Sequence, residues 1–262
     1  ESKSKGLGCQ SGFCWRSKYG ERETYSRIEK GMIGEVRAAY GTYLGNTPWV
    51  KERKAEWSDF EYQLRNWMYF CWLSGDHIVE QHVHNLDVCN WVMGAHPVRC
   101  WGMGARQQLN GKSGEIWDNF AVEYEYPNGV RMYSYCGQIK RDFSSVSEAV
   151  VGSKGTSNPA GNIKPNQGEG WRFRDKAIDP YVQEHMDLMN AVINNTDLNG
   201  YAGFNEVFPI DFNDVDMDRM WTHLLELFVR FGRIAVSKAD HSAFDSYFSA
   251  VVANSAITGL DP

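Results

Sequence analysis

The segment from Gly75 to Gly94 concentrates the side chains that could do chemistry. Its twenty residues hold three histidines, three acids and a glutamine, and glycine closes both ends. Imidazole is the side chain best suited to accept and release protons near neutral pH. On a helix, four-residue spacing places Glu80 beneath His84, where a carboxylate can orient a histidine base. If this chain performs catalysis, we expect it here.

Three interpretations of this polar face stay open on spacing alone. The predicted face carries His77, Glu80, Gln81 and His84, whereas His82 points elsewhere and is predicted to be structural. The face could hold a histidine base, or it could share a zinc or iron ion. The chain has no His-Glu-x-x-His motif, which disfavours a metalloprotease. A polar helix face can also simply be solvated.

The elements expected to position this segment are strands and helices in mixed order. Apolar periodicity predicts helices over 21–30, 77–93, 181–194 and 214–231. Alternation predicts strands over 12–15, 35–44, 97–103, 119–126, 130–139, 146–151 and 171–174, and the Asn128-Gly129 turn predicts a hairpin. Residues 152–170, rich in Gly, Ser, Asn and Pro, predict a long loop. We therefore expect an α+β fold with an open, mostly antiparallel sheet and helices packed on one face.

Composition limits the classes of function. A chain of 262 residues can bury a sizeable core, and its net charge of −6 offers no basic stripe for nucleic acid. No apolar run is long enough to span a membrane. Six irregularly spaced cysteines favour reduced, mostly buried thiols and a cytoplasmic location, with the periplasm kept open. The polar start at Glu1 is expected for a processed piece of a longer polypeptide or a trimmed end.

Several stretches together resemble the C-terminal domain of the Gfo/Idh/MocA oxidoreductases. They are Arg27–Val36, Gly75–Gly94, His96–Val98, Gly102–Gln107, Phe120–Val130 and Tyr181–His185. Members of this family pair an N-terminal Rossmann domain with a C-terminal α+β domain that holds an open antiparallel sheet. The resemblance predicts such a domain over residues 1–198, with 199–262 a divergent helical extension of the same domain.

The resemblance also implies roles for individual residues. His84 would take the proton from a sugar hydroxyl as hydride leaves the same carbon, and Glu80 stands where the family more often has aspartate. Asp87, three residues after His84, is expected to be a helix-surface or structural residue. The predicted substrate ligands are Arg16, Lys18, Arg65 and Gln81, although a surface salt bridge is an equal alternative for each cation.

The function implied is the substrate-binding and catalytic domain of an NAD(P)-dependent oxidoreductase that acts on a sugar, cyclitol or glycoside hydroxyl. NAD or NADP would be bound by a Rossmann domain absent from this chain, which contains no Gly-x-Gly-x-x-Gly turn, so the chain alone is expected to be inactive. Alternatives are NAD-dependent glycoside cleavage with the same His84, and a non-catalytic oligomerisation or scaffold domain. Expected partners are a small carbohydrate and further copies bound through the open sheet face; no nucleic acid, membrane or metal is expected.

Overall fold

The computed structural model describes residues 12–109, 114–139 and 143–194. The helix predicted over 214–231 and the extension predicted over 199–262 lie outside the described residues. No helix in the described ranges is long and apolar enough to cross a membrane.

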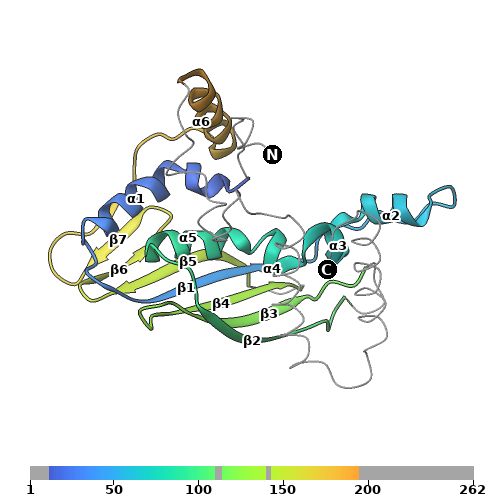
Figure 1. Cartoon of the computed structure of the whole chain (residues 1–262), viewed down its shortest axis with the longest axis horizontal. Coiled ribbons are helices and arrows are strands. Elements are labelled where there is room, and N and C mark those ends of the chain that lie inside the picture. The colour runs from blue at the N-terminus through green and yellow to red at the C-terminus, as the bar shows by residue number, and fades with distance from the viewer. Residues whose placement is uncertain (1–11, 110–113, 140–142, 195–262) are drawn as a thin grey trace, which may run out of the picture. The chain divides into compact units, whose positions relative to one another are not determined.

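An eight-stranded sheet forms the base of the described part of the chain (Figure 1), in the order β2-β3-β4-β1-β5-β6-β7-β8. Neighbouring strands run antiparallel except β1 and β4, which are parallel. The strands are β1 Val36–Gly45, β2 Arg99–Ala105, β3 Asn119–Glu125, β4 Arg131–Gln138, β5 Ser145–Gly152, β6 Gly155–Asn158, β7 Asn162–Pro165 and β8 Trp171–Arg172. The predicted open, mostly antiparallel sheet is confirmed.

Helices lie over one face of this sheet, and no described helix covers the other face (Figure 1). They are the 3-10 helix η2 Cys14–Ser17, α1 Tyr19–Glu29, α2 Asp59–Arg65, the 3-10 helix η3 Trp67–Tyr69, α3 Cys71–Ser74, α4 His77–Glu80, α5 Val83–Met93 and α6 Pro180–Asn194. Helix α5 packs on β1 and β5, and η2 and α1 pack on the outer side of α5. Helix α5 is therefore enclosed between the sheet and the N-terminal segment.

The main core lies between these helices and the sheet. Its buried residues are Ile28, Ile33, Ala39, Cys89, Tyr126, Met132, Val150 and Ile163. A second cluster joins the region of η3 to the loop after β2 through Met68, Tyr69, Phe70, Leu109 and Ile116. Full burial of a side chain of this size contributes about 1.5–3 kcal/mol. All five described cysteines are free thiols, as predicted.

Two local predictions are wrong. Residues 12–15, predicted as a strand, enter η2 instead, because Phe13 and Cys14 bury against helices rather than pairing with a strand. Residues 152–170, predicted as a loop, form β6 and β7. Gly155 permits close strand pairing, since a Cβ there would meet the Lys164 carbonyl oxygen at 2.7 Å. Gly161 turns the chain with φ +125°.

The helix predicted over 77–93 is also interrupted. Helix α4 ends at Glu80 and α5 begins at Val83. Between them, the His82 amide donates to the His77 carbonyl at 3.1 Å, a five-residue π-type step. The predicted end of the helix is confirmed, because Gly94 caps it in the left-handed conformation with φ +60°.

Candidate active site on helix α5

Helix α5 presents polar residues on two sides. His84, Asp87 and Trp91 face η2 and α1, where they meet aromatic and basic side chains. His82 and Asn85 face the sheet and are completely buried. The interpretation of a merely solvated face therefore fails for this helix.

His84 is half-buried among aromatic rings from the N-terminal segment. Its ring stacks on Trp15, with centroids 5.2 Å apart and planes at 24°, and meets the edge of Phe13 at 5.8 Å. Burial, aided by the charge of Lys18, lowers the pKa of His84 to about 4. Its buried Nδ1 has no hydrogen-bond partner among the described residues. At neutral pH the imidazole is therefore uncharged.

Glu80 lies at the end of α4. Burial raises its pKa, and its Oε2 is buried without a hydrogen-bond partner among the described residues. Burial, and secondly the charge of Glu80, raises the pKa of Tyr43. Tyr43 also meets the edge of His77 at 5.4 Å. The helix break removes the regular spacing behind the predicted contact between Glu80 and His84, and the structure describes no hydrogen bond between them.

Gln81 is held by a residue that the sequence did not single out. Gln138, at the end of β4, donates from Nε2 to Gln81 Oε1 at 3.0 Å. Gln138 is 2% exposed, and its own Oε1 is buried without a partner among the described residues. Buried polar atoms nearly always have a partner, so the lack of one at Gln138 Oε1 and Glu80 Oε2 among the described residues requires an explanation.

Arg16 occupies a different environment from a pocket-lining residue. It is fully buried, and its Nε and Nη2 bind the two carboxylate oxygens of Asp87, both at 2.8 Å. The guanidinium also lies 5.0 Å from the centroid of the Trp91 ring. Arg16 thus anchors η2 to α5, and Asp87 has the structural position predicted for it.

The other two predicted cations lie apart from each other. Lys18 Nζ is 3.1 Å from Glu21 Oε1 and 4.1 Å from the centroid of the Trp15 ring, so it lies beside the ring that stacks on His84. Arg65 lies on α2, which projects away from α5 (Figure 1), and binds Glu61 at 2.8 Å. The structure therefore brings Lys18, but not Arg65, close to the His84 environment.

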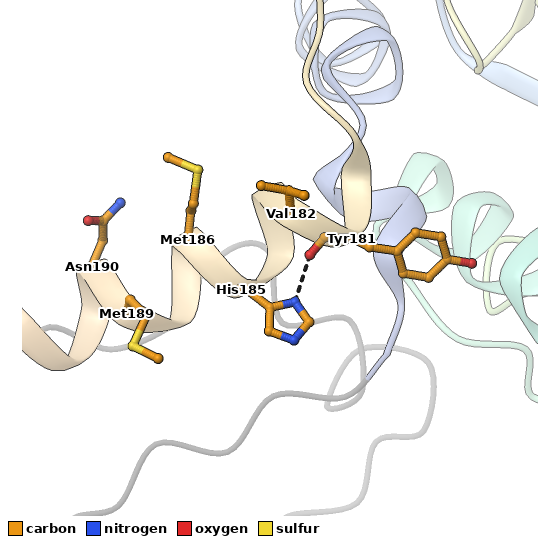
Figure 2. Close-up of a pocket in the computed structure, with 6 residues that line it drawn as sticks. All are labelled: Tyr181, Val182, His185, Met186, Met189 and Asn190. Carbon is orange, nitrogen blue, oxygen red and sulfur yellow. Dashed lines mark hydrogen bonds between the residues drawn. The ribbon is translucent and has the colours of Figure 1, made fainter.

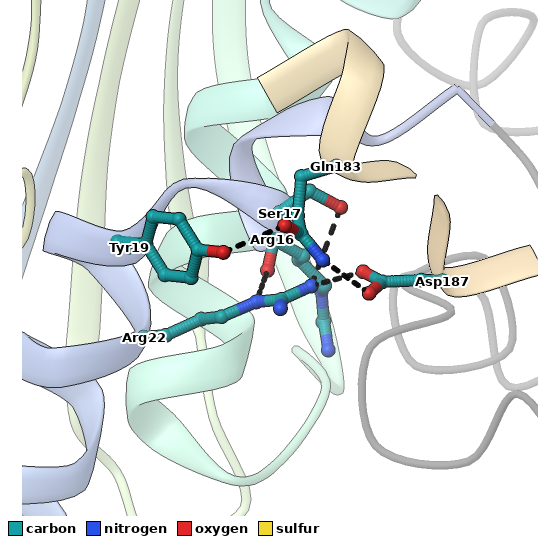
Figure 3. Close-up of polar contacts among 6 residues, drawn as sticks. All are labelled: Arg16, Ser17, Tyr19, Arg22, Gln183 and Asp187. Atoms are coloured by element: carbon teal, nitrogen blue, oxygen red, sulfur yellow. Dashed lines mark hydrogen bonds and ion pairs between the residues drawn. The ribbon is translucent and has the colours of Figure 1, made fainter. Parts of the chain in front are cut away.

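Polar contacts connect α6 to the segment that carries Trp15 (Figure 3). Tyr19 Oη donates to Gln183 Oε1 at 2.7 Å, and Arg22 pairs with Asp187. Arg22 Nε also donates to the Arg16 carbonyl at 2.7 Å. Helix α6 therefore supports η2 from outside. No signal in the sequence predicts this support, because its partners are more than 160 residues apart.

An open depression of about 430 Å³ lies on α6 (Figure 2). Its lining residues are Tyr181, Val182, His185, Met186, Met189 and Asn190. The lining is mostly apolar, and the His185 ring is engaged with the Tyr181 carbonyl oxygen at 2.7 Å. The buried polar atoms of Glu80, His84 and Gln138 that lack a partner among the described residues belong to α4, α5 and β4 instead. Within the described ranges, no group of three or more His, Cys, Asp and Glu residues could hold a metal ion.

The solved structures that share this fold include the following three. An aldose-aldose oxidoreductase from Caulobacter crescentus, complexed with glycerol, has a TM-score of 0.61 and 15% identity, over 77% of this chain and 58% of its own. Myo-inositol 2-dehydrogenase from Lactobacillus plantarum has a TM-score of 0.54 and 19% identity, over 75% of this chain and 58% of its own. A super-repressor mutant of Gal80p from Saccharomyces cerevisiae has a TM-score of 0.57 and 12% identity, over 79% of this chain and 59% of its own. At these identities the likeness shows the fold alone.

The chain thus spans less than two thirds of the length of these neighbours. No curated protein sequence matches it. The family model of the GFO/IDH/MocA C-terminal domain matches residues 22–158, which is more than half of the chain. That stretch includes α4, α5 and the strands that carry the candidate site, and the protein belongs to the Gfo/Idh/MocA family of oxidoreductases.

Proposed function

We propose that this chain is the substrate-binding and catalytic domain of an NAD(P)-dependent oxidoreductase that acts on a hydroxyl group of a sugar, cyclitol or glycoside. The observation that supports it most is the state of His84. Its imidazole is uncharged, its Nδ1 is unpaired among the described residues, and Trp15 and Phe13 restrict the ring. A general base must be unprotonated at the working pH and must be held in a fixed orientation.

In this proposal His84 accepts the hydroxyl proton of the bound substrate. A nicotinamide, when bound, accepts the hydride from the same carbon. Loss of the hydride from this carbon requires a proton acceptor at the attached oxygen. The uncharged imidazole of His84 is proposed to be that acceptor. We assign no dinucleotide-binding role to the described residues and propose that a domain outside these 262 residues holds NAD or NADP.

Substrate orientation is proposed to come from the polar atoms around α4 and β4. Glu80 Oε2 and Gln138 Oε1 can accept hydrogen bonds from ring hydroxyls, and Gln138 holds Gln81 beside them. Lys18 and Trp15 would form the neighbouring wall. One structural neighbour is complexed with glycerol and another is named for myo-inositol, so both are associated with polyhydroxylated molecules.

The test uses the complete protein with a panel of aldoses, cyclitols and glycosides. Reduced nicotinamide is followed by its absorbance with NAD and with NADP. Removing a general base typically reduces the rate by about 10²–10⁴-fold, so His84→Gln should lose at least about a hundredfold in kcat. His185→Gln, on the exposed surface of α6, is the matched control. Unchanged kcat in His84→Gln would overturn the proposal and favour the scaffold alternative.

The same assay separates oxidation from glycoside cleavage. Both reactions would use His84, but only cleavage releases the aglycone of a nitrophenyl glycoside. Net reduction of the nicotinamide without aglycone release supports the oxidoreductase. Aglycone release without net reduction would replace it with the cleaving reaction.

We also propose that copies of the chain associate through the open face of the sheet. Large apolar side chains are exposed there: Tyr40 at 38%, Trp101 at 39%, Tyr135 at 46% and Met103 at 73%. A patch of this kind on a sheet face is suited to a self-complementary contact. Light scattering should show a dimer or larger assembly that Met103→Glu weakens, and an unchanged mass in that variant would contradict this arrangement.

A further inference from the structure

The side of α5 that faces the sheet carries a continuous chain of hydrogen bonds. Ser134 Oγ lies 2.6 Å from His82 Nε2, and His82 Nδ1 lies 3.1 Å from Asn85 Oδ1. Asn85 Nδ2 then donates to Glu148 Oε1 at 2.6 Å. The exposed fractions of these four residues lie between 0% and 4%. The chain therefore connects β4 to α5 and α5 to β5 in the interior of the protein.

Each hydrogen bond in this series has a fixed donor and a fixed acceptor. The Ser147 carbonyl oxygen, which can only accept, lies 3.4 Å from Asn85 Nδ2, so the amide nitrogen of Asn85 must face β5. Asn85 Oδ1 is then an acceptor, and His82 Nδ1 must carry the hydrogen. His82 Nε2 is left to accept from the Ser134 hydroxyl. Burial lowers the pKa of His82 to about 3, so its ring stays neutral and keeps this tautomer.

These hydrogen bonds hold the first turn of α5. Helix α5 begins after the π-type step without a side-chain cap. Its first turn contains a three-residue hydrogen bond from the His84 amide to the Gln81 carbonyl at 3.3 Å. Gly41 in β1 lets this turn approach the sheet, since a Cβ there would meet Asn85 Cβ at 3.3 Å and His82 Cε1 at 3.7 Å. His84 lies within this turn and points to the opposite side, onto Trp15.

We propose that His82, Asn85 and Glu148 are positioning residues for His84. Their hydrogen bonds fix the first turn of α5 on the sheet, and that turn places the ring of His84 against Trp15. The inference rests on the proposed function for the catalytic importance of His84, but the position of the ring can be measured without any activity.

A donor-reversal series tests the proposal at pH 8. Asn85→Asp removes the amide donor and places a second carboxyl group against Glu148; the two carboxyl groups then share one proton, which replaces the amide link by a contact of different geometry. Glu148→Gln keeps an acceptor for Asn85, so we expect it to change the position of the His84 ring little. In the double variant, the glutamine amide at position 148 can donate to the new carboxylate at position 85, which also accepts from His82, so every link is restored in reversed direction. Asn128→Asp, in the exposed hairpin turn, is the control for the change of charge.

The first measurement is the NMR shift of the His84 ring protons in this chain. The ring current of the stacked Trp15 moves these protons upfield, so Asn85→Asp should move them downfield, and the double variant should return them. The charges of Glu21 and Lys18 in the N-terminal segment act on the pKa of Glu148, and every variant keeps both. An unchanged His84 shift in folded Asn85→Asp, or a double variant no closer to the wild type than Asn85→Asp, would overturn the inference.

The second measurement is kcat in the complete protein. Displacing a catalytic ring by about an ångström lowers kcat roughly tenfold to a hundredfold. We therefore expect Asn85→Asp to lower kcat by this factor with a smaller change in KM, and the double variant to recover kcat. If Asn85→Asp does not fold, Ser134→Ala removes one link without adding charge and should move the His84 shift in the same direction; no movement overturns the inference. If the shifts respond as expected but His84→Gln stays active, the proposed function fails and the positioning inference stands.

Discussion

Replacing Glu148 with glutamine should stabilise the protein at alkaline pH and change little at acidic pH. Burial raises the pKa of Glu148 from 4.5 to about 7 in the folded protein. Between these values the folded state retains a proton that the unfolded state has lost, so the free energy of unfolding decreases as pH rises through this window. At pH 8 the decrease amounts to about 3 kcal/mol, against less than about 1 kcal/mol at pH 5.

Glutamine lacks this titration and keeps an oxygen for Asn85. The stability gained by Glu148→Gln should therefore be about 2–3 kcal/mol larger at pH 8 than at pH 5. For a folded unit of this size, that corresponds to a difference in Tm on the order of 5–10 °C. Thermal unfolding followed by circular dichroism at both pH values measures it, with Glu29→Gln on the exposed surface of α1 as control. An equal change at the two pH values, or a larger gain at pH 5, would refute the reasoning.

Three further variants address other contacts. Lys18→Met should raise the pKa of His84, because a positive charge that opposes protonation is removed; an NMR titration checks this, and an unchanged pKa contradicts it. Arg16→Met removes the bidentate partner of the buried Asp87 carboxylate and should destabilise the fold by about 3–5 kcal/mol in urea unfolding, whereas adding Asp87→Leu should recover most of the loss. Asp76→Ala removes the acceptor of two backbone amides at φ +71° and should cost about 2–3 kcal/mol, more than Asp76→Asn, which keeps an acceptor and tolerates positive φ. Equal losses in the two Asp76 variants would contradict that account.

The sequence predicted the elements whose signals are local. Asn128-Gly129 identified the hairpin of β3 and β4, and Gly94 identified the end of α5, because each glycine supplies a backbone conformation that other residues disfavour. The break before α5 had no such signal, since neither Gln81 nor His82 is a helix breaker. Its cause is tertiary: His82 turns toward Ser134, which is 52 residues away in sequence.

In the candidate site too, features with a local sequence signal were predicted and features that depend on tertiary contacts were not. Residue type and spacing led to the Gly75–Gly94 segment, and the resemblance to the family then singled out His84, whose role stays a prediction. The sequence did not identify Trp15 or Gln138, because each reaches the site from a distant part of the chain. Arg16 carried a basic signal next to Trp15, but its partner Asp87 is 71 residues away and only the fold brings them together. Pairings of this kind depend on which strands and helices neighbour each other.

The most direct test of the central claim is the pH dependence of hydride transfer in the complete protein with His84 intact and replaced by glutamine. The claim is that His84 accepts the substrate proton. The wild type should therefore show an acidic limb in kcat/KM that moves to higher pH in Lys18→Met, and His84→Gln should lose both the limb and at least about a hundredfold of the rate. An acidic limb that persists in an active His84→Gln variant would show that another group carries the proton.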